Sequence, residues 1–176
     1  MWANDMADDP QQGTNAQLAA LAALDDELRG EGIDYWLFGG WAVDFHAGAV
    51  TRRHDDLDVA VWAADADRIG RLLGAGGWAH RPADGGDGYT VYVRGAVKLE
   101  MAFLARDETG DAYTPLPDGR AEWPAGAFGD DVAELHGVRA RVIGLAALRV
   151  EKSQQHADPL VAAKDRADTA TLARLR

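Results

Sequence analysis

The sequence predicts an α/β domain followed by a short C-terminal extension of two helices. Short runs of β-branched and aromatic residues alternate with segments whose apolar residues recur at helical spacing. After residue 143 only helical patterns remain. With 176 residues, of which 47% are hydrophobic and 27% charged, the chain is long enough for one core. We therefore expect an α/β domain over residues 1–143 and a helical extension over residues 144–176, within one compact unit.

The first segment with a regular pattern predicts an amphipathic helix. Thr14 or Asn15 can cap this helix and Gly30 ends it. Residues 33–38, IDYWLF, predict a buried strand, and a short helix follows and ends at Gly48. The apolar stripe of the first helix consists of Leu18, Leu21, Leu24 and Leu28.

The middle of the chain alternates between strand and helix patterns. Residues 57–62 predict a second strand, and residues 65–77 predict a helix that ends in glycines. Two runs of alternating polarity, residues 88–95 and 97–105, predict a hairpin that turns at Gly95. The inward side chains of the helix are Ile69, Leu72 and Leu73.

The last third of the chain combines an irregular segment with two helices. Residues 107–130 contain three prolines and are expected to form a loop or a lid. Residues 138–144, VRARVIG, predict the last strand. Two helices follow from residue 145 to the end, separated by a polar break near residues 156–159.

Composition narrows the classes of function. No apolar run approaches the roughly 18 residues of a membrane span, and the acidic residues 1–13 lack a signal pattern, so we expect a cytoplasmic protein with a frayed leader. The absence of cysteine excludes disulfides and thiolate metal sites. A net charge of −11 argues against a broad nucleic-acid footprint. It fits a cationic small-molecule partner, with solubility alone as the alternative.

Two acids stand at the start of the strand in TRRHDDLDVAVW. Because alternate residues of a strand face the same side, about 6.5 to 7 Å apart, Asp56 and Asp58 can aim their carboxylates together. Such oxygens suit a hard divalent ion, Mg²⁺ above all. The alternative is that both acids are solvent-facing charges at a strand end, paired with Arg52 and Arg53. Separately, Arg52 could have the structural role of bracing Asp56.

A third acid lies inside a later strand pattern. In VKLEMAFL, Glu100 is on the face opposite Leu99 and Met101, and an adjacent strand would bring it to the other two acids. It could complete a metal site or accept a proton from an attacking hydroxyl. A surface ion pair with Lys98 is the alternative.

Gly39 and Gly40 lie between a strand and a helix. Such a turn lets the backbone approach a ligand and offers free N–H groups at a helix N-terminus to anionic oxygens. A glycine pair alone is a weak signal. The order of this pair, the T-R-x-H-x-D-h-D run and a later strand acid is much stronger evidence for one site.

These residues resemble a known family. WLFGGWAVDFHAG followed by TRRHDDLDV resembles the minimal nucleotidyltransferase fold of the DNA polymerase β superfamily, in particular the antibiotic nucleotidyltransferases that adenylylate aminoglycosides at the 2″ position and lincosamides. The resemblance is clearest over residues 35–62, continues weakly through Glu100, and returns in KDRADTATL, residues 164–172. It implies an α+β nucleotidyltransferase fold, with a mixed sheet flanked by helices.

The resemblance also implies roles for individual residues. Gly39 and Gly40 would hold nucleotide phosphates, and Asp56 and Asp58 would hold Mg²⁺. Glu100 would be the third acid of the metal site and the general base, although the family often has Asp there. The residues expected to meet the triphosphate are Arg52, His54, Lys152 and Lys164.

Several charged residues have ordinary structural alternatives. Asp44 on the short helix is expected mainly at the surface, where it can hold the next loop. Lysines on amphipathic helices are solvated by default, which applies to Lys152 and Lys164. Acids of the last helix would pair along it, Asp165 and Asp168 with Arg166 or Lys164.

The expected function is Mg²⁺-dependent transfer of a nucleoside monophosphate, AMP from ATP, to a hydroxyl of a small cationic acceptor such as an aminoglycoside or a lincosamide. The compact chain leaves room for a second subunit to supply part of the acceptor surface, and hence for a homodimer. One alternative is a toxin-type nucleotidyltransferase that modifies tRNA or a protein. Another is a nucleotide-binding regulator without turnover.

Overall fold

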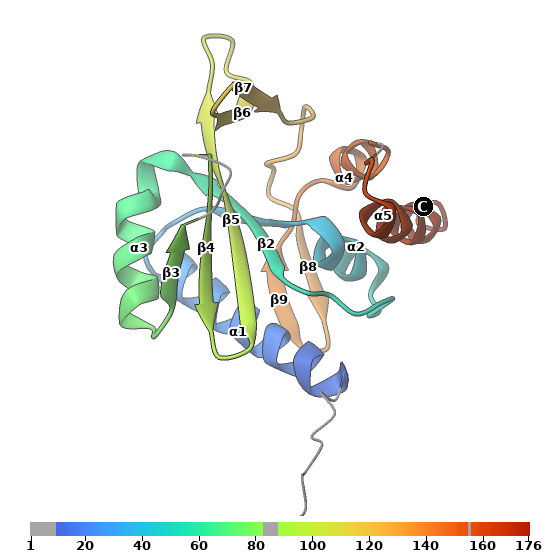
Figure 1. Ribbon diagram of the computed structural model, residues 1–176, viewed down its shortest axis with the longest axis horizontal. Coiled ribbons are helices and arrows are strands. Elements are labelled where there is room, and N and C mark those ends of the chain that lie inside the picture. The colour runs from blue at the N-terminus through green and yellow to red at the C-terminus, as the bar shows by residue number, and fades with distance from the viewer. Residues whose placement is uncertain (1–9, 83–87, 155) are drawn as a thin grey trace, which may run out of the picture.

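The computed structural model describes residues 10–82, 88–154 and 156–176. Within these residues a mixed sheet of seven strands forms the centre of the molecule (Figure 1). Five strands follow the order β1-β2-β5-β4-β3, and a hairpin of β6 and β7 continues from the end of β5. The strands are β1 (Tyr35–Phe38), β2 (Leu57–Trp62), β3 (Ala79–Pro82), β4 (Tyr89–Arg94), β5 (Val97–Arg106), β6 (Ala112–Leu116) and β7 (Gly119–Glu122).

The pairing of β2 with β5 decides which side chains share a face. These two strands are parallel, whereas β1 with β2 and β4 with β5 are antiparallel. Their register places Asp58 beside Glu100 and Leu57 beside Leu99. Because side chains alternate between the faces of a sheet, the acids share one face and the leucines the other.

Helices pack behind the sheet and beside it (Figure 1). Helix α1 runs behind the sheet, α3 flanks β3, and α2, α4 and α5 gather at one side (Figure 1). The last three helices contact one another, so the C-terminal helices pack onto the helix that follows β1. The helices are α1 (Pro10–Gly30), α2 (Gly39–Ala47), α3 (Ala66–Ala75), α4 (Leu145–Lys152) and α5 (Pro159–Leu172), with a short 3₁₀ turn at Ala63–Asp65.

The hydrophobic core joins α1 to the apolar face of the sheet. Leu57 and Leu99, opposite the acids, are fully buried, as are Leu21 and Leu28 of α1. The predicted apolar stripe of the first helix is therefore confirmed. Burying side chains of this size contributes about 1.5 to 3 kcal/mol each, which fixes the strands that carry the acids.

A second, two-stranded sheet leads the chain back to β1. It pairs β8 (Val132–Leu135) with β9 (Val138–Arg141). Beyond β9 the backbone N–H of Ile143 donates to the carbonyl of Leu37 in β1, at 3.0 Å. The chain therefore enters α4 next to the strand that ends at the two glycines.

The observed mixed sheet and C-terminal helices confirm the predicted α+β fold class, with three local corrections. Helix α1 begins at Pro10 instead of Thr14, because proline is favoured in a first helical turn. Residues 107–130, expected as a loop or lid, contain the β6–β7 hairpin. Pro115 fits there because it lies beyond the residues of β6 that pair with β5. The short strands β3 and β8 have no apolar periodicity and were not expected.

No helix in the described part of the chain has both the length and the hydrophobicity needed to cross a membrane. Residues 1–9, most of the expected leader, lie outside the described residues.

The position of the core predicts that the same leucine-to-alanine change lowers the free energy of unfolding much more at a buried site than at an exposed one. Leu21→Ala should lower the free energy of unfolding by about 2 to 5 kcal/mol, because Leu21 is fully buried. The control Leu160→Ala should stay within about 0.5 kcal/mol of the parent protein, since Leu160 is 76% exposed. Urea denaturation measures both, and equal losses would contradict this core.

Candidate active site

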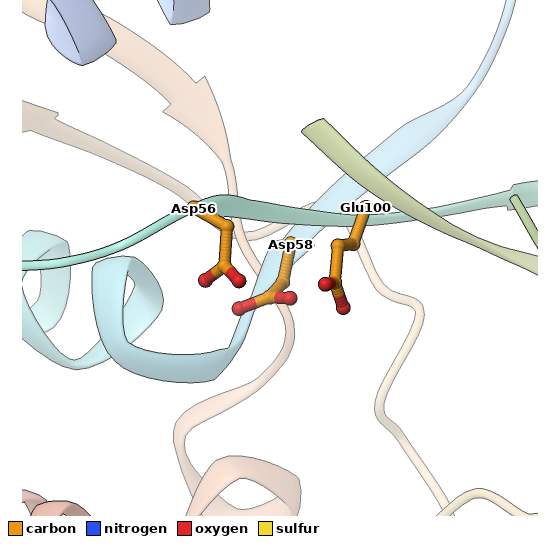
Figure 2. A group of neighbouring side chains, drawn as sticks. All are labelled: Asp56, Asp58 and Glu100. Atoms are coloured by element: carbon orange, nitrogen blue, oxygen red, sulfur yellow. The ribbon is translucent and has the colours of Figure 1, made fainter. Parts of the chain in front are cut away.

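Three carboxylates meet where β2 and β5 lie side by side (Figure 2). Asp56 immediately precedes β2, Asp58 is within that strand, and Glu100 lies beside Asp58 on β5. One oxygen of each carboxylate lies within 4.8 Å of the other two. The parallel register thus brings together the three acids that the sequence singles out.

The acids repel one another in partly buried surroundings. Burial raises the pKa of Asp58 well above its ordinary value, and the charges of Asp56, Glu100 and Glu151 raise it further. The pKa of Asp56 is raised by burial and then by Glu100. Lys98 contacts Glu100 and lies 3.6 Å from Asp56, so the expected pair with Glu100 does form. One lysine faces three acids, and the cluster retains excess negative charge.

This donor set fits a hard divalent cation. All three side chains offer carboxylate oxygens, the ligands that Mg²⁺ prefers, and the described residues contain no cysteine that would favour a softer metal. A divalent ion would also offset the repulsion that raises the two pKa values. The residues that would hold it are Asp56, Asp58 and Glu100.

Gly39 and Gly40 form the first turn of α2 directly against these acids. Gly39 has a φ of 66°, and a Cβ atom there would overlap a carboxylate oxygen of Asp58. A Cβ on Gly40 would overlap the guanidinium of Arg52 and the ring of His54. Both positions therefore favour glycine, because the side chains of Asp58, Arg52 and His54 crowd the turn.

The backbone N–H of Gly39 lies near the carboxylate of Glu151 on α4. Burial raises the pKa of Glu151, and the Gly39 backbone partly opposes this shift. The Oε2 atom of Glu151 is buried without a hydrogen-bond partner among the described residues.

His54 is held in place by a fully buried acid. Its Nε2 lies 2.5 Å from Asp44 Oδ2, and its ring packs on Trp41 with 4.6 Å between centroids. Asp44 also accepts hydrogen bonds from the backbone N–H of Thr51, at 3.0 Å, and from its hydroxyl. Asp44 is 0% exposed, so the expected surface position was wrong, whereas its role in holding the loop is confirmed.

Arg52 binds the C-terminal helix instead of Asp56. Its Nε and Nη2 donate to the two carboxylate oxygens of Asp168, at 2.8 and 2.9 Å. The expectations that Arg52 braces Asp56 and that Asp168 pairs along its own helix are both corrected. A pairing that joins the loop before β2 to α5 depends on the tertiary fold, which helical spacing cannot reveal.

The two lysines differ in their surroundings. Lys152 is only 9% exposed and lies 3.2 Å from Asp168 and 3.4 Å from Asp165, so it is not the solvated lysine expected by default. Burial alone would lower the pKa of Lys152, but the charges of Glu151, Asp168 and Asp165 raise it. Lys164 is about half exposed and pairs with Asp55 at 2.5 Å.

A cavity of about 180 Å³ joins these groups. It lies between the first turn of α2, the loop before β2, and the helices α4 and α5. All predicted site residues line it except Gly39 and Glu100, which adjoin it through Asp58. The predicted residues that line it are Gly40, Arg52, His54, Asp56, Asp58, Lys152 and Lys164.

The sequence profile of the aminoglycoside-2″-adenylyltransferase family matches residues 20–172, which include every residue of the cavity. The chain belongs to this family. A stretch of 39 residues is 46% identical to 2″-aminoglycoside nucleotidyltransferases of Escherichia coli and Klebsiella pneumoniae. That stretch covers 22% of this chain and 20% of each relative, about a fifth of their length.

Solved structures share the fold at low sequence identity. The lincosamide antibiotic adenylyltransferase LnuA, with lincomycin bound, superposes with a TM-score of 0.71 and 18% identity, over 90% of this chain and 97% of that one. ANT(2″)-Ia in complex with adenylyl-2″-tobramycin gives 0.66 and 18% identity, over 90% and 87%. These likenesses confirm the nucleotidyltransferase fold.

Three acids of the site escaped the sequence reasoning. The sequence pattern gives Asp44 and Asp168 ordinary charge roles and does not single out Glu151. Each acid meets its neighbour only in the folded chain: Asp44 contacts His54, Asp168 contacts Arg52, and Glu151 lies near the Gly39 backbone. The one available signal was the K-D-x-x-D pattern around Asp168, which does not identify a partner.

The glycine turn generates a matched pair of substitutions. Gly39→Ala and Gly48→Ala both place alanine at a φ near 67°, since the two φ values are 66° and 68°. Each should cost about 1 to 2 kcal/mol of stability. Only Gly39→Ala displaces Asp58, because no atom lies within 4 Å of a Cβ on Gly48. Calorimetry should show at least about tenfold weaker binding of Mg²⁺·ATP for Gly39→Ala alone; equal affinities would contradict the crowded turn.

Proposed function

We propose that the protein is a Mg²⁺-dependent adenylyltransferase that transfers AMP from ATP to a hydroxyl of a small cationic acceptor, such as an aminoglycoside or a lincosamide. The observation that carries this proposal is the carboxylate cluster of β2 and β5, within 4.8 Å and beside the cavity of α2. Membership of the aminoglycoside-2″-adenylyltransferase family supports the reaction type. The reaction would take place in the cytoplasm.

The reaction we propose is an in-line displacement at the α-phosphorus of ATP. The acceptor oxygen forms a bond to phosphorus while the bond to the pyrophosphate oxygen breaks, and the hydroxyl proton passes to a base. Glu100 is the base we assign, since it lies at the end of the cluster next to Lys98. Mg²⁺, when bound, neutralises charge on the triphosphate.

The cations of the cavity would orient the triphosphate. Arg52 lies against Gly40 at the first turn of α2, where the helix N-terminus also favours an anion. Lys152 and Lys164 line the same cavity from α4 and α5. Positioning and electrostatic stabilisation of this kind supply most of the catalysis in phosphoryl-type transfers.

The acceptor class follows from charge and from relatives. A net charge of −11 raises the local concentration of cations around the protein and disfavours RNA as a partner. Lincomycin is bound in LnuA, and ANT(2″)-Ia was captured with adenylyl-2″-tobramycin. These observations support an antibiotic acceptor, held by one chain or at the interface of a homodimer.

The first test is pyrophosphate release from Mg²⁺·ATP in the presence of a panel of aminoglycosides and lincosamides. At least one acceptor should support turnover, and EDTA should abolish it because the carboxylate cluster then lacks its ion. Asp58→Asn should reduce kcat/KM by at least about a thousandfold, about 4 kcal/mol of transition-state stabilisation. Labelling of total RNA or of lysate proteins, with no antibiotic modified, would favour the toxin-type alternative instead.

The role of Glu100 makes a separate prediction. Glu100→Gln should lower kcat by about 10² to 10⁴, the usual contribution of a general base, while changing the KM for ATP little. Glu122→Gln is the matched control, because Glu122 is exposed on β7 and pairs with Arg120. If Glu100→Gln and Glu122→Gln are equally active, Glu100 is not the base.

A further inference from the structure

Asp168 is a deeply buried acid beside the cavity, in contact with two of the cations that line it. Asp168 lies within α5 and its side chain is 1% exposed. The side chain pairs with a residue outside this helix and not with solvent or with a neighbour along the helix. Both carboxylate oxygens receive N–H groups of Arg52, and Oδ2 also lies 3.2 Å from Lys152 Nζ. Burial by itself would raise the pKa of Asp168, but these two cations hold it below its ordinary value.

The fork between Arg52 and Asp168 fixes where the guanidinium points. A guanidinium carries five N–H groups. The contacts to Asp168 use one on Nε and one on Nη2, and Nη1 donates to the carbonyl of Arg53 at 3.1 Å. One N–H therefore remains on each terminal nitrogen. Because Nη2 lies where a Cβ of Gly40 would be, its remaining donor adjoins the first turn of α2.

The packing of α5 against the rest of the protein does not require a buried ion pair. Buried ion pairs seldom stabilise a fold more than apolar residues of similar size, because both charges lose their hydration. Here the buried pair joins α5 to the loop that carries Asp56, and both cations it contacts line the cavity. Arg52 and Lys152 share one carboxylate oxygen, so Asp168 also offsets the repulsion between two positive charges held close together.

We propose that Asp168 is a positioning residue for the nucleotide: its buried fork holds Arg52 at the first turn of α2, where the remaining guanidinium donors bind a phosphate oxygen of Mg²⁺·ATP. This inference rests on the proposed function, since it assumes that ATP occupies the cavity. It assigns to α5 a direct influence on nucleotide affinity, and it predicts that this influence passes through Arg52.

A double-mutant cycle on the full chain tests this coupling. Calorimetry with Mg²⁺ and a non-hydrolysable ATP analogue measures the dissociation constant without any acceptor. Asp168→Asn should weaken binding about tenfold or more, the loss expected for a hydrogen bond to a charged group. In an Arg52→Ala background the same change should weaken binding less than about threefold, because its target is already gone.

Two further variants separate positioning from stability. Asp25→Asn is the matched control, because Asp25 is a buried acid bound by Tyr35 and Arg29 away from the cavity; it should lower the melting temperature and leave nucleotide affinity unchanged. Arg52→Lys retains a cation but cannot form the fork. It should weaken binding as much as Asp168→Asn, and it serves in its place if Asp168→Asn does not fold.

The outcomes are distinct. If the parent protein binds no Mg²⁺·ATP, the proposed function fails and the inference fails with it. If the parent binds the nucleotide and Asp168→Asn binds it equally well, or weakens it by the same factor with and without Arg52, only the positioning role is overturned. A melting temperature that falls while affinity stays unchanged would make Asp168 a structural residue only.

Discussion

The main constraint on the structure is that three carboxylates, which repel one another, are held within 4.8 Å on neighbouring strands. Two parallel strands with fully buried leucines on their far face cannot shift to separate these acids, because a slip of one residue would turn the leucines out of the core. Burial, and then repulsion among the acids, raises the pKa values of Asp56 and Asp58, and Lys98 alone does not balance the negative charge. A divalent cation does so most directly.

The surroundings of the cluster hold each component by buried contacts. Gly39 leaves room for the carboxylate of Asp58 and lies near Glu151 of α4. Asp44 of α2 holds His54, and Asp168 of α5 holds Arg52. The last two contacts join the loop before β2 to helices, so α2 and α5 define the geometry of that loop. This arrangement favours a pre-formed site for a small ligand.

The sequence predicted correctly which face of each strand carries the acids, because this depends on the local alternation of residues. The alternation of β2 put Asp56 and Asp58 on one side, and the burial of Leu99 and Met101 put Glu100 on the face toward them. Local pattern does not contain the partners of charged residues: Arg52 binds an acid 116 positions away. The proline content of residues 107–130 likewise led to a wrong prediction of a loop. Pro115 is tolerated because that part of β6 pairs with β7 alone.

The most direct test of the account is a crystal structure of the protein with Mg²⁺ and a non-hydrolysable ATP analogue. The account predicts an ion bound by Asp56 and Asp58, in contact with the triphosphate, whose remaining oxygens meet Arg52 near Gly40. A nucleotide bound elsewhere on the molecule, or one bound here with no ion between it and the two aspartates, would contradict the central claim.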